Sequence, residues 1–428
     1  MLSTESLYEK FQACGRVSTD TRRIAPGSLF FALKGERFNA NQFARQALDN
    51  GAAYAIIDEV KYQHDERYLL VEDVLTSLQQ LAYHHRMTLN IPVIGINGTN
   101  GKTTTKELLH AVLSKKYRTL ATQGNLNNHI GVPLTLLQLT SDTEIAIIEL
   151  GANHVGEIGA LCQIAHPSHG LTTNIGKAHM EGFGGLEGAI RGESEQYDYL
   201  LKTNGVVFIN SQNELLRNMS KRFGQPYFYP APGDYFSCTL LSADPFVVYQ
   251  PEERAPVETQ LIGAYNFENI AAALCIGKYF EVPEEAANEA VRSYQPTNKR
   301  SQVVKQGSNT IILDAYNANP DSMQAAIRNL EAMQADQKAV LLGDMYELGD
   351  DATAEHRAIG ELLAQGNIQH VLFCGSLMKT AHQACPGSQH FADKASLEGY
   401  LRQHPLAHST ILVKGSRGMA METLLAAL

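Results

Sequence analysis

Short runs of apolar residues recur along the chain, and most are followed by a segment whose apolar positions repeat at helical spacing. Runs without polar alternation are typical of parallel strands covered on both faces, and strands that alternate with helical patterns are typical of βαβ units. The sequence therefore predicts an α/β protein built on parallel sheets. The predicted strands lie at residues 29–33, 53–57, 91–94, 145–150, 171–176, 205–210, 310–313, 339–342, 370–373 and 410–413.

The helical patterns are clearest at four places. A helix at about residues 41–50 ends before Gly51, a residue type that commonly terminates helices. Three further helices each present one apolar face, as expected for helices that cover a sheet. The residues on these faces are Leu108, Leu109, Val112 and Leu113; Phe267, Ile270, Ala271 and Leu274; and Met323, Ile327 and Leu330.

The length of 428 residues is too great for one hydrophobic core, so we expect two or three domains. We place a small α/β N-terminal domain at residues 1–87. A central P-loop-type domain, with a mononucleotide-binding parallel sheet, follows at residues 88–296. A C-terminal Rossmann-like α/β domain is expected at residues 297–428.

The charge balance of the chain limits the classes of partner that it could bind. Asp and Glu number 45 against 35 Lys and Arg, a formal net charge of −10, whereas nucleic-acid-binding proteins usually show a basic field. We therefore expect no nucleic acid. The absence of a run of 18 apolar residues predicts no membrane insertion. The six cysteines lack CxxC spacing, which indicates free thiols in a reducing compartment such as the cytoplasm. We expect a monomer.

One strand-to-helix connection has the composition of a phosphate-binding loop. Residues 98–104 read Gly-Thr-Asn-Gly-Lys-Thr-Thr. Glycines let backbone N–H groups turn toward an anion, and a helix N-terminus adds partial positive charge. The general pattern has a glycine where Ile96 stands, so the match is to a tighter variant. We interpret the stretch as an ATP site rather than a polar turn. Its binding residues would be Gly98, Thr99, Asn100, Gly101, Lys102, Thr103 and Thr104.

Within this loop, Lys102 would reach the outer phosphates and the Thr103 hydroxyl would hold Mg²⁺. Two other polar side chains follow predicted strands of the same domain, namely Glu149 and His179. Ligands of open α/β sheets bind at the carboxyl ends of strands, and carboxylate oxygen suits Mg²⁺. Histidine is an unusual Mg²⁺ ligand, so its residue type alone favours a solvated or hydrogen-bonding role for His179.

The loop at residues 98–104 resembles that of the Mur ligases and of their relatives, the folylpolyglutamate synthetases. Two more stretches are similar to motifs of this family: Glu-Leu-Gly-Ala-Asn at 149–153 and Asn-Ile-Gly-Lys-Ala-His-Met-Glu-Gly-Phe-Gly at 174–184. The resemblance implies that Glu149 ligates a metal ion and that His179 binds a second one.

Resemblance also implies the rest of the nucleotide site. Residues 266–273 are similar to a stretch in which an asparagine amide meets the adenine, so Asn266 and Asn269 would contact the base. Tyr265 takes the place of the usual histidine. Arg300 is similar in position to an arginine that the third domain brings to the phosphates, and Asp314 matches an aspartate near the ribose.

Four stretches point to the peptide substrates. Residues 125–133 resemble a loop beside the reacting carboxylate, which implies contacts from Asn127 and Asn128; a turn network is the alternative. Tyr-Asn-Ala-Asn-Pro-Asp-Ser-Met at 316–323 looks like the family members that add D-alanyl-D-alanine to UDP-N-acetylmuramoyl-tripeptide, and residues 343–349 and 413–419 agree. The implied substrate-binding residues of the third domain are Tyr316, Asn317, Asn319, Lys414 and Arg417.

Two departures from the family pattern concern the catalytic charge and the uridine side. Many members carry a carbamylated lysine in an Ala-Lys-x-Glu stretch. In this chain, Ile-Arg-Gly-Glu-Ser-Glu-Gln-Tyr at 190–197 puts Glu193 at that position, and we expect Glu193 to take over the charge role of the lysine. In the first domain, residues 35–43 lack the usual Asp-Gly-His. Candidate contacts to the UDP part are Thr19, Thr21 and Ser28, although such groups are more often solvated caps.

The resemblance implies a two-step reaction. A substrate carboxylate attacks the γ-phosphate of ATP to give an acyl phosphate and ADP, and the dipeptide amine then displaces phosphate. Lys102, Glu149, His179, Glu193 and Arg300 would be the catalytic residues, with ATP and Mg²⁺ bound. The alternatives are a folylpolyglutamate synthetase-like ligase and a ligase-derived nucleotide-binding module without activity.

Overall fold

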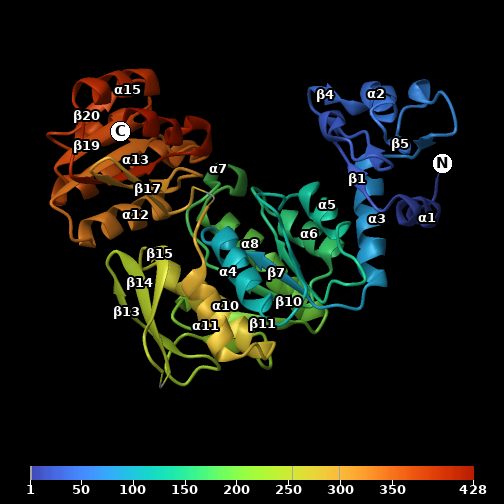
Figure 1. The fold of residues 1–428 in the computed structure, drawn as a ribbon, viewed down its shortest axis with the longest axis horizontal. Coiled ribbons are helices and arrows are strands. Elements are labelled where there is room, and N and C mark those ends of the chain that lie inside the picture. Colours follow the sequence, from blue (N-terminus) through green and yellow to red (C-terminus); the bar gives the residue numbers. More distant parts are fainter. Residues whose placement is uncertain (1, 253, 298) are drawn as a thin grey trace.

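The computed structural model describes residues 2–252, 254–297 and 299–428, and each predicted domain range holds a largely parallel sheet. The central lobe lies between the other two, and the long helix α3 (Val74–Thr88) runs from the first lobe down to it (Figure 1). The predicted three-part α/β architecture is therefore confirmed, while the domain boundaries themselves stay predictions.

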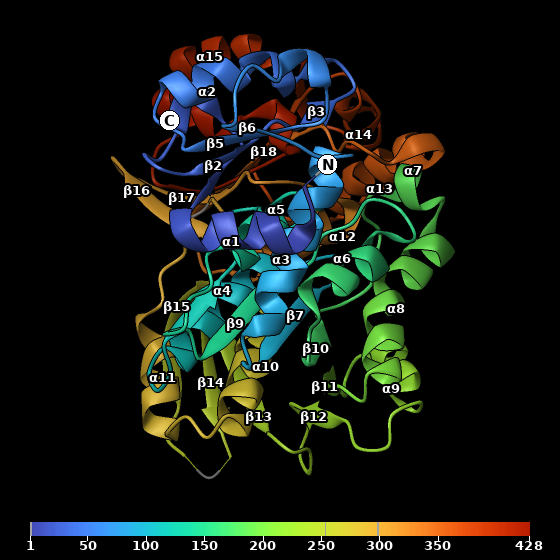
Figure 2. The ribbon, with the colours of Figure 1, turned by 90° about the vertical axis from the view of Figure 1, so that its right-hand side faces the viewer.

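The first domain has four parallel strands in the order β1-β2-β5-β6 and a short antiparallel ribbon, β3-β4. Figure 2 shows α1 crossing α3, which in turn lies beside α5 (Gly131–Leu136) and α6 (Glu157–Ala165) of the central domain. The strands are β1 (Val17–Ser18), β2 (Leu29–Phe31), β3 (Lys34–Gly35), β4 (Phe38–Asn39), β5 (Tyr54–Ile57) and β6 (Tyr68–Leu70); the other helices are α1 (Thr4–Cys14) and α2 (Ala44–Asp49).

The central domain has a six-stranded parallel sheet in the order β12-β11-β10-β7-β9-β8. Its strands are β7 (Val93–Asn97), β8 (Thr119–Ala121), β9 (Ile145–Glu149), β10 (His169–Thr172), β11 (Val206–Asn210) and β12 (Tyr227–Tyr229). Its helices are α4 (Lys102–Leu113), α5 (Gly131–Leu136), α6 (Glu157–Ala165), α7 (Met180–Phe183), α8 (Leu186–Lys202), α9 (Glu214–Ser220), α10 (Asn266–Tyr279) and α11 (Glu284–Ser293).

A separate antiparallel sheet in this domain was not expected from the sequence. It consists of β13 (Cys238–Ala243), β14 (Phe246–Pro251) and β15 (Val257–Ile262). In β14 and β15, buried and more exposed positions largely alternate, so these strands lack the continuous apolar runs that marked the parallel sheets.

The third domain has six strands in the order β16-β17-β21-β18-β19-β20, all parallel except the edge strand β16. Its strands are β16 (Gln302–Gln306), β17 (Asn309–Asp314), β18 (Gln337–Gly343), β19 (His370–Cys374), β20 (Gln389–Phe391) and β21 (Ser409–Lys414). Its helices are α12 (Pro320–Ala332), α13 (Ala352–Gln365), α14 (Met378–Ala384) and α15 (Lys394–Gln403).

Two predicted elements shift. The strand expected at 171–176 is β10, which ends at Thr172 because the side chains of Thr173 and Asn174 turn to hydrogen-bond the neighbouring loop at Asn100. The helix expected at 41–50 begins as a 3₁₀ turn (Ala40–Phe43) and becomes helical only in α2. All six cysteines are free, as expected, and five of them are buried.

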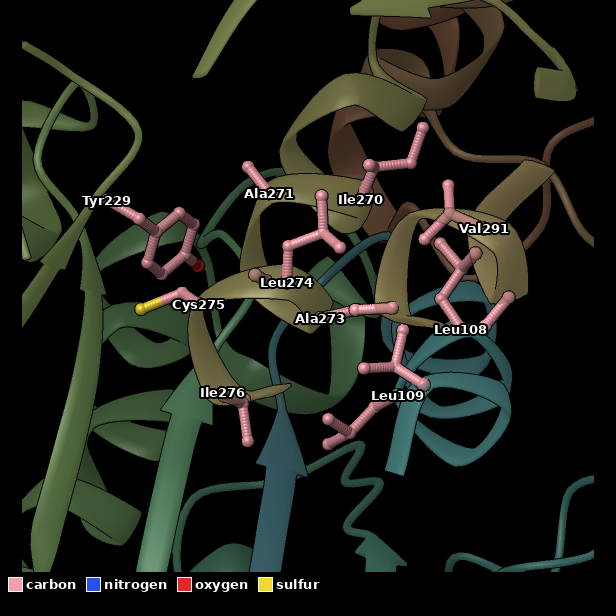
Figure 3. Close-up of a cluster of buried hydrophobic side chains, with 14 of the residues drawn as sticks. Leu108, Leu109, Tyr229, Ile270, Ala271, Ala273, Leu274, Cys275, Ile276 and Val291 are labelled. Atoms are coloured by element: carbon pink, nitrogen blue, oxygen red, sulfur yellow. The ribbon is translucent and has the colours of Figure 1, made fainter. Parts of the chain in front are cut away.

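The core of the central domain forms where α4 packs against α10 and α11. Leu108 and Leu109 of α4 point toward Ala273 and Val291, and all four side chains are fully buried (Figure 3). Small residues on α10 allow this close packing, since a Cβ added to Gly277 would lie 2.6 Å from Val112 Cγ1. The helix that follows the predicted phosphate loop is thus fixed from behind by apolar contact.

We expect Leu109→Ala to lower the free energy of unfolding of the central domain by about 2–5 kcal/mol, because it leaves a cavity between α4 and α10. Urea unfolding followed by circular dichroism measures the change. Lys115→Ala, an exposed position just beyond the same helix, is the control. Equal unfolding midpoints for the two variants would contradict this packing role.

Candidate active site

A cleft of about 1100 Å³ lies between the central and third domains. It is lined by the loops that follow β7, β9 and β10 of the central sheet and β17 and β21 of the third-domain sheet. Ligands of open α/β sheets bind at such strand ends. Most of the predicted nucleotide, metal and third-domain substrate residues therefore line one cavity.

Residues 98–101 connect β7 to α4 and form the predicted phosphate loop. Gly98 and Gly101 have positive φ angles of 125° and 85°, which side-chain-bearing residues rarely adopt. A Cβ on Gly101 would lie 2.5 Å from Asn269 Oδ1, so this position admits only glycine. Lys102 begins α4, and its ammonium donates to the carbonyl groups of Gly98 and Thr99.

The carboxylate of Glu149 lies at the end of β9, beside the first turn of α4. Its Oε1 accepts hydrogen bonds from Thr103 Oγ1 (3.2 Å) and Asn127 Nδ2 (2.8 Å). Its Oε2 is buried and has no hydrogen-bond partner within the described ranges. A carboxylate oxygen without a hydrogen bond, next to a threonine hydroxyl, is an oxygen donor set that suits Mg²⁺.

Lys106 is a buried cation that the sequence analysis missed. Its ammonium lies 3.6 Å from Glu149 Oε2, and both side chains are at most 3% exposed. The sequence pattern could have revealed it, because Lys106 lies on the buried face of α4 that also includes Leu109 and Leu113. A lysine among apolar positions indicates a buried charge partner.

His179 lines the same cleft but has its nearest acidic partner in the third domain. It precedes α7 with a positive φ of 51°, and its Nδ1 lies 2.5 Å from Glu347 Oε2. This contact lowers the pKa of the Glu347 carboxyl. The described residues contain no group of three or more His, Cys, Asp or Glu side chains placed to hold a metal ion. The role of His179 as a metal ligand stays a prediction.

Glu193 lies behind the phosphate loop. Its Oε2 accepts hydrogen bonds from Asn97 Nδ2 (2.7 Å) and the Gly98 backbone N–H (2.9 Å), and the residue is 4% exposed. The expected placement of Glu193 at the lysine position is corrected here: when the family pattern Ala-Lys-x-Glu is laid on residues 190–193, Arg191 occupies the lysine position and Glu193 the glutamate position. Glu193 is therefore placed to act through the loop, and a direct charge role at the phosphates stays a prediction.

The third domain contributes cations and aromatic surface to the cleft. The guanidinium carbon of Arg300 lies 3.7 Å from the centre of the Tyr316 ring, and that of Arg417 lies 5.3 Å from it. Lys414 Nζ donates to Asp314 Oδ2 (2.5 Å) and to the Asn317 carbonyl (3.1 Å). These residues form one cluster at the ends of β17 and β21.

The two asparagines predicted to meet the adenine are buried at the start of α10. Asn266 Nδ2 donates to the Ile262 carbonyl, and Asn269 Nδ2 donates to Asn266 Oδ1. Asn269 Oδ1 accepts from Thr105 Oγ1. Both asparagines line the cleft, and their contacts to a base stay predictions.

The asparagine loop contains the turn network that was the alternative interpretation. Asn128 Oδ1 accepts hydrogen bonds from the backbone N–H groups of Ile130 and Gly131, which is a turn network. Asn127 instead donates to Glu149 and faces the cleft. Both asparagines line the cleft, and a role in substrate binding stays a prediction.

The three candidates in the first domain are not brought to this cleft. Thr19 lines a separate groove of about 870 Å³ between the first and central domains. Thr21 begins a 3₁₀ turn, and Ser28 is 0% exposed with no hydrogen-bond partner for its hydroxyl within the described ranges. Their contacts to a substrate stay predictions, and Ser28 would need a change in its surroundings to make one.

Comparison with known proteins agrees with this geometry. Residues 96–277 match the family model for the Mur ligase middle domain, and residues 299–417 match the Mur ligase, glutamate ligase domain. The UDP-N-acetylmuramoyl-tripeptide–D-alanyl-D-alanine ligase of Bacillus subtilis (strain 168) is 36% identical over 95% of this chain and 91% of its own length. The chain belongs to the Mur ligase family. The resemblance expected from its motifs is confirmed.

Solved structures of family members superimpose over nearly the whole chain. A crystal structure of MurF from Acinetobacter baumannii matches with a TM-score of 0.87 at 32% identity, covering 96% of this chain and 92% of that one. A MurF ligase from Thermotoga maritima, in complex with ADP, matches with a TM-score of 0.85 at 26% identity, covering 96% of both chains. Within the described residues, no helix combines the length and apolar character needed to cross a membrane.

We expect Lys106→Met to destabilise the fold by about 3–5 kcal/mol, because it leaves the buried charge of Glu149 without its cation. Combining it with Glu149→Gln removes the unpaired charge and should recover much of the loss. Chemical unfolding of the single and double variants measures this, with Lys115→Met as the exposed control. A double variant no more stable than Lys106→Met would contradict the pairing.

Burial raises the pKa of Glu193 above its ordinary value of 4.5, although Lys102 and two N–H donors oppose the shift. A carboxyl whose pKa is raised by folding contributes stability that is lost as the pH rises through that pKa. Glu193→Gln stays neutral, so its stability relative to the parent should increase as the pH rises above the ordinary carboxyl pKa of 4.5. Thermal unfolding across this range tests the slope, and exposed Glu187→Gln on the same helix should show none.

Proposed function

We propose that this chain is an ATP-dependent ligase that joins D-alanyl-D-alanine to UDP-N-acetylmuramoyl-tripeptide in peptidoglycan precursor synthesis. The observation that carries the proposal is the cleft, which brings the phosphate loop and Glu149 together with Tyr316, Asn317 and Asn319 of the third domain. The relative from Bacillus subtilis, alike over nearly its full length, bears the name of this activity. We place the reaction in the cytoplasm and expect a monomer.

The nucleotide site is proposed from the loop and from the ADP named in the Thermotoga maritima structure. Lys102, Thr103 and Thr104 begin α4 and line the cleft, and the first N–H groups of a helix lack intrahelical partners, so phosphate oxygens would accept their hydrogen bonds. Thr103 and Glu149 would hold Mg²⁺ together with phosphate oxygens and water. When bound, Mg²⁺ supplies positive charge that offsets the charge of the transferring phosphoryl group.

In the first proposed step, an oxygen of the tripeptide carboxylate attacks the γ-phosphorus, and the bond to the bridging oxygen of ADP breaks. In the second, the dipeptide amine attacks the acyl carbon, loses a proton, and inorganic phosphate leaves. Phosphoryl transfer requires mainly positioning and charge stabilisation. Lys102 and Arg300 would supply the cations, and the third domain would shield the acyl phosphate from water.

Two alternatives are separated by one assay. A folylpolyglutamate synthetase-like ligase would not require D-alanyl-D-alanine, and an inactive nucleotide-binding module would release no phosphate with any substrate. The proposed ligase releases phosphate from ATP only when UDP-N-acetylmuramoyl-tripeptide and D-alanyl-D-alanine are both present. Phosphate release that is independent of the dipeptide would overturn the proposal.

We expect Lys102→Met to lower kcat/KM for ATP by about 10²- to 10³-fold, by analogy with the loss of other preorganised charge-stabilising groups. Initial rates of product formation measure the effect. Lys115→Met is the matched control, since it removes the same charge beyond the other end of α4. A rate for Lys102→Met within twofold of the control would argue against phosphate binding at this loop.

A further inference from the structure

The segment at residues 174–181, after β10, lies between the phosphate loop and the third domain. On the loop side, the Gly176 N–H donates to Thr99 Oγ1 (2.8 Å) and the Asn100 N–H donates to Asn174 Oδ1 (3.0 Å). On the other side, Met180 is 8% exposed and belongs to the hydrophobic cluster of the third domain. A displacement of the third domain would therefore move residues 174–181 and, through their hydrogen bonds, the phosphate loop.

Lys177 is the charged residue at the centre of this segment. Its backbone N–H donates to Asp321 Oδ2 (2.7 Å), and its ammonium donates to Glu355 Oε1 (2.6 Å). Contact with Glu355 raises the pKa of the Lys177 ammonium, and the charges of Asp321 and Asp351 add to this effect. All three carboxylates belong to the third domain, so one central-domain cation faces three third-domain anions.

Asp321 and Asn319, at the start of α12, bring the same surface to the loop itself. The Asp321 carboxylate packs against the backbone of Gly176, where an added Cβ would lie 2.2 Å from Oδ2. Asn319 Nδ2 donates to Asn100 Oδ1 (2.8 Å), a direct bond from the third domain to the phosphate loop. The contacts of Lys177 are thus part of a continuous polar network that ends at the nucleotide site.

We propose that Lys177 is a positioning residue that latches the third domain to the phosphate loop and couples domain closure to nucleotide binding. The family pattern, Asn-x-Gly-x-Ala-His, assigns nothing to this position. The kinetic part of the proposal rests on the proposed function. Lys177 touches no reacting atom; it acts through residues 174–176 on the loop and through Asp321 and Glu355 on the third domain.

The surroundings of the Lys177–Glu355 ion pair determine how much it contributes to holding the two domains together. Isolated surface ion pairs contribute little, and the Lys177 side chain is 45% exposed. Glu355, however, is only 13% exposed, and the backbone bond to Asp321 and the buried Met180 fix the same segment. The proposed latch requires an undocked arrangement besides the docked one seen here, and coupling between two sites typically changes an affinity about 5- to 150-fold.

Charge reversal provides a sharp test. Lys177→Glu should raise KM for ATP and lower kcat, reducing kcat/KM by about tenfold or more. Glu355→Lys alone should also impair the enzyme, and the double variant, with the pair reversed, should recover most of the loss. Lys202→Glu on α8 makes the same change at an exposed site away from the cleft and should behave like the parent.

Small-angle X-ray scattering provides a readout that does not depend on catalysis. With a non-hydrolysable ATP analogue, the parent and Lys202→Glu should have a smaller radius of gyration than Lys177→Glu, and the reversed pair should restore compaction. Equal compaction of all variants, or a double variant no better than the product of the two single effects, would overturn the latch. Should Lys177→Glu fail to fold, Lys177→Gln is judged by the same criteria.

The two proposals fail in different ways. A parent chain that forms no product from the three substrates would overturn the proposed function, whatever the scattering shows. An active parent whose kinetics and compaction are insensitive to Lys177 would overturn only the latch.

Discussion

The phosphate loop depends on a division of its backbone N–H groups between two tasks. The first three are used to hold the loop in shape: Gly98 donates to Glu193, and Thr99 and Asn100 donate to Asn174. The residues that follow, Lys102, Thr103 and Thr104, begin α4 and line the cleft, and the first N–H groups of a helix lack intrahelical partners. A loop supported from behind in this way presents its donors without first having to reorganise, which is the condition for strong electrostatic stabilisation.

Buried charge is concentrated at the same edge of the central sheet. The strands of a parallel sheet are covered on both faces, so polar side chains gather where the strands end. Glu149, Lys106 and Thr103 meet there, and Glu149 and Thr103 also line the cleft. Apolar packing of α4 against α10 places these groups, since every residue between Lys106 and Leu113 that faces inward is part of one core. Stability and chemistry therefore share the same helix.

Much of this arrangement was predictable because it depends on local patterns. Continuous apolar runs located most strands of the two larger parallel sheets to within a few residues, and the glycine pattern located the loop. The antiparallel sheet β13–β15 was missed because its strands lack such runs. Contacts across domains were also beyond the sequence: nothing in the residues themselves indicates that His179 meets Glu347, or that Lys177 meets Glu355, since these pairs are 168 and 178 positions apart.

The position of Ser28 shows another limit of residue type. As a serine beside a turn it resembled a ligand or a solvated cap, whereas its side chain is wholly enclosed. Glu193 shows a related limit. Its acidic residue type predicted a negative charge near the phosphates, whereas its burial raises the pKa of the carboxyl and so opposes the charged form. Burial and pairing come from tertiary packing, which one sequence does not reveal.

The position of Met180 has a consequence for chimaeric enzymes in which the third domain is exchanged between relatives. This central-domain side chain belongs to the apolar cluster of the third domain, which also includes Met345 and Leu348. A third domain taken from a relative would therefore have a cavity shaped for that relative's own side chain at the position of Met180. A chimaera that exchanges the third domain should therefore take the short α7 segment from the same relative as the third domain.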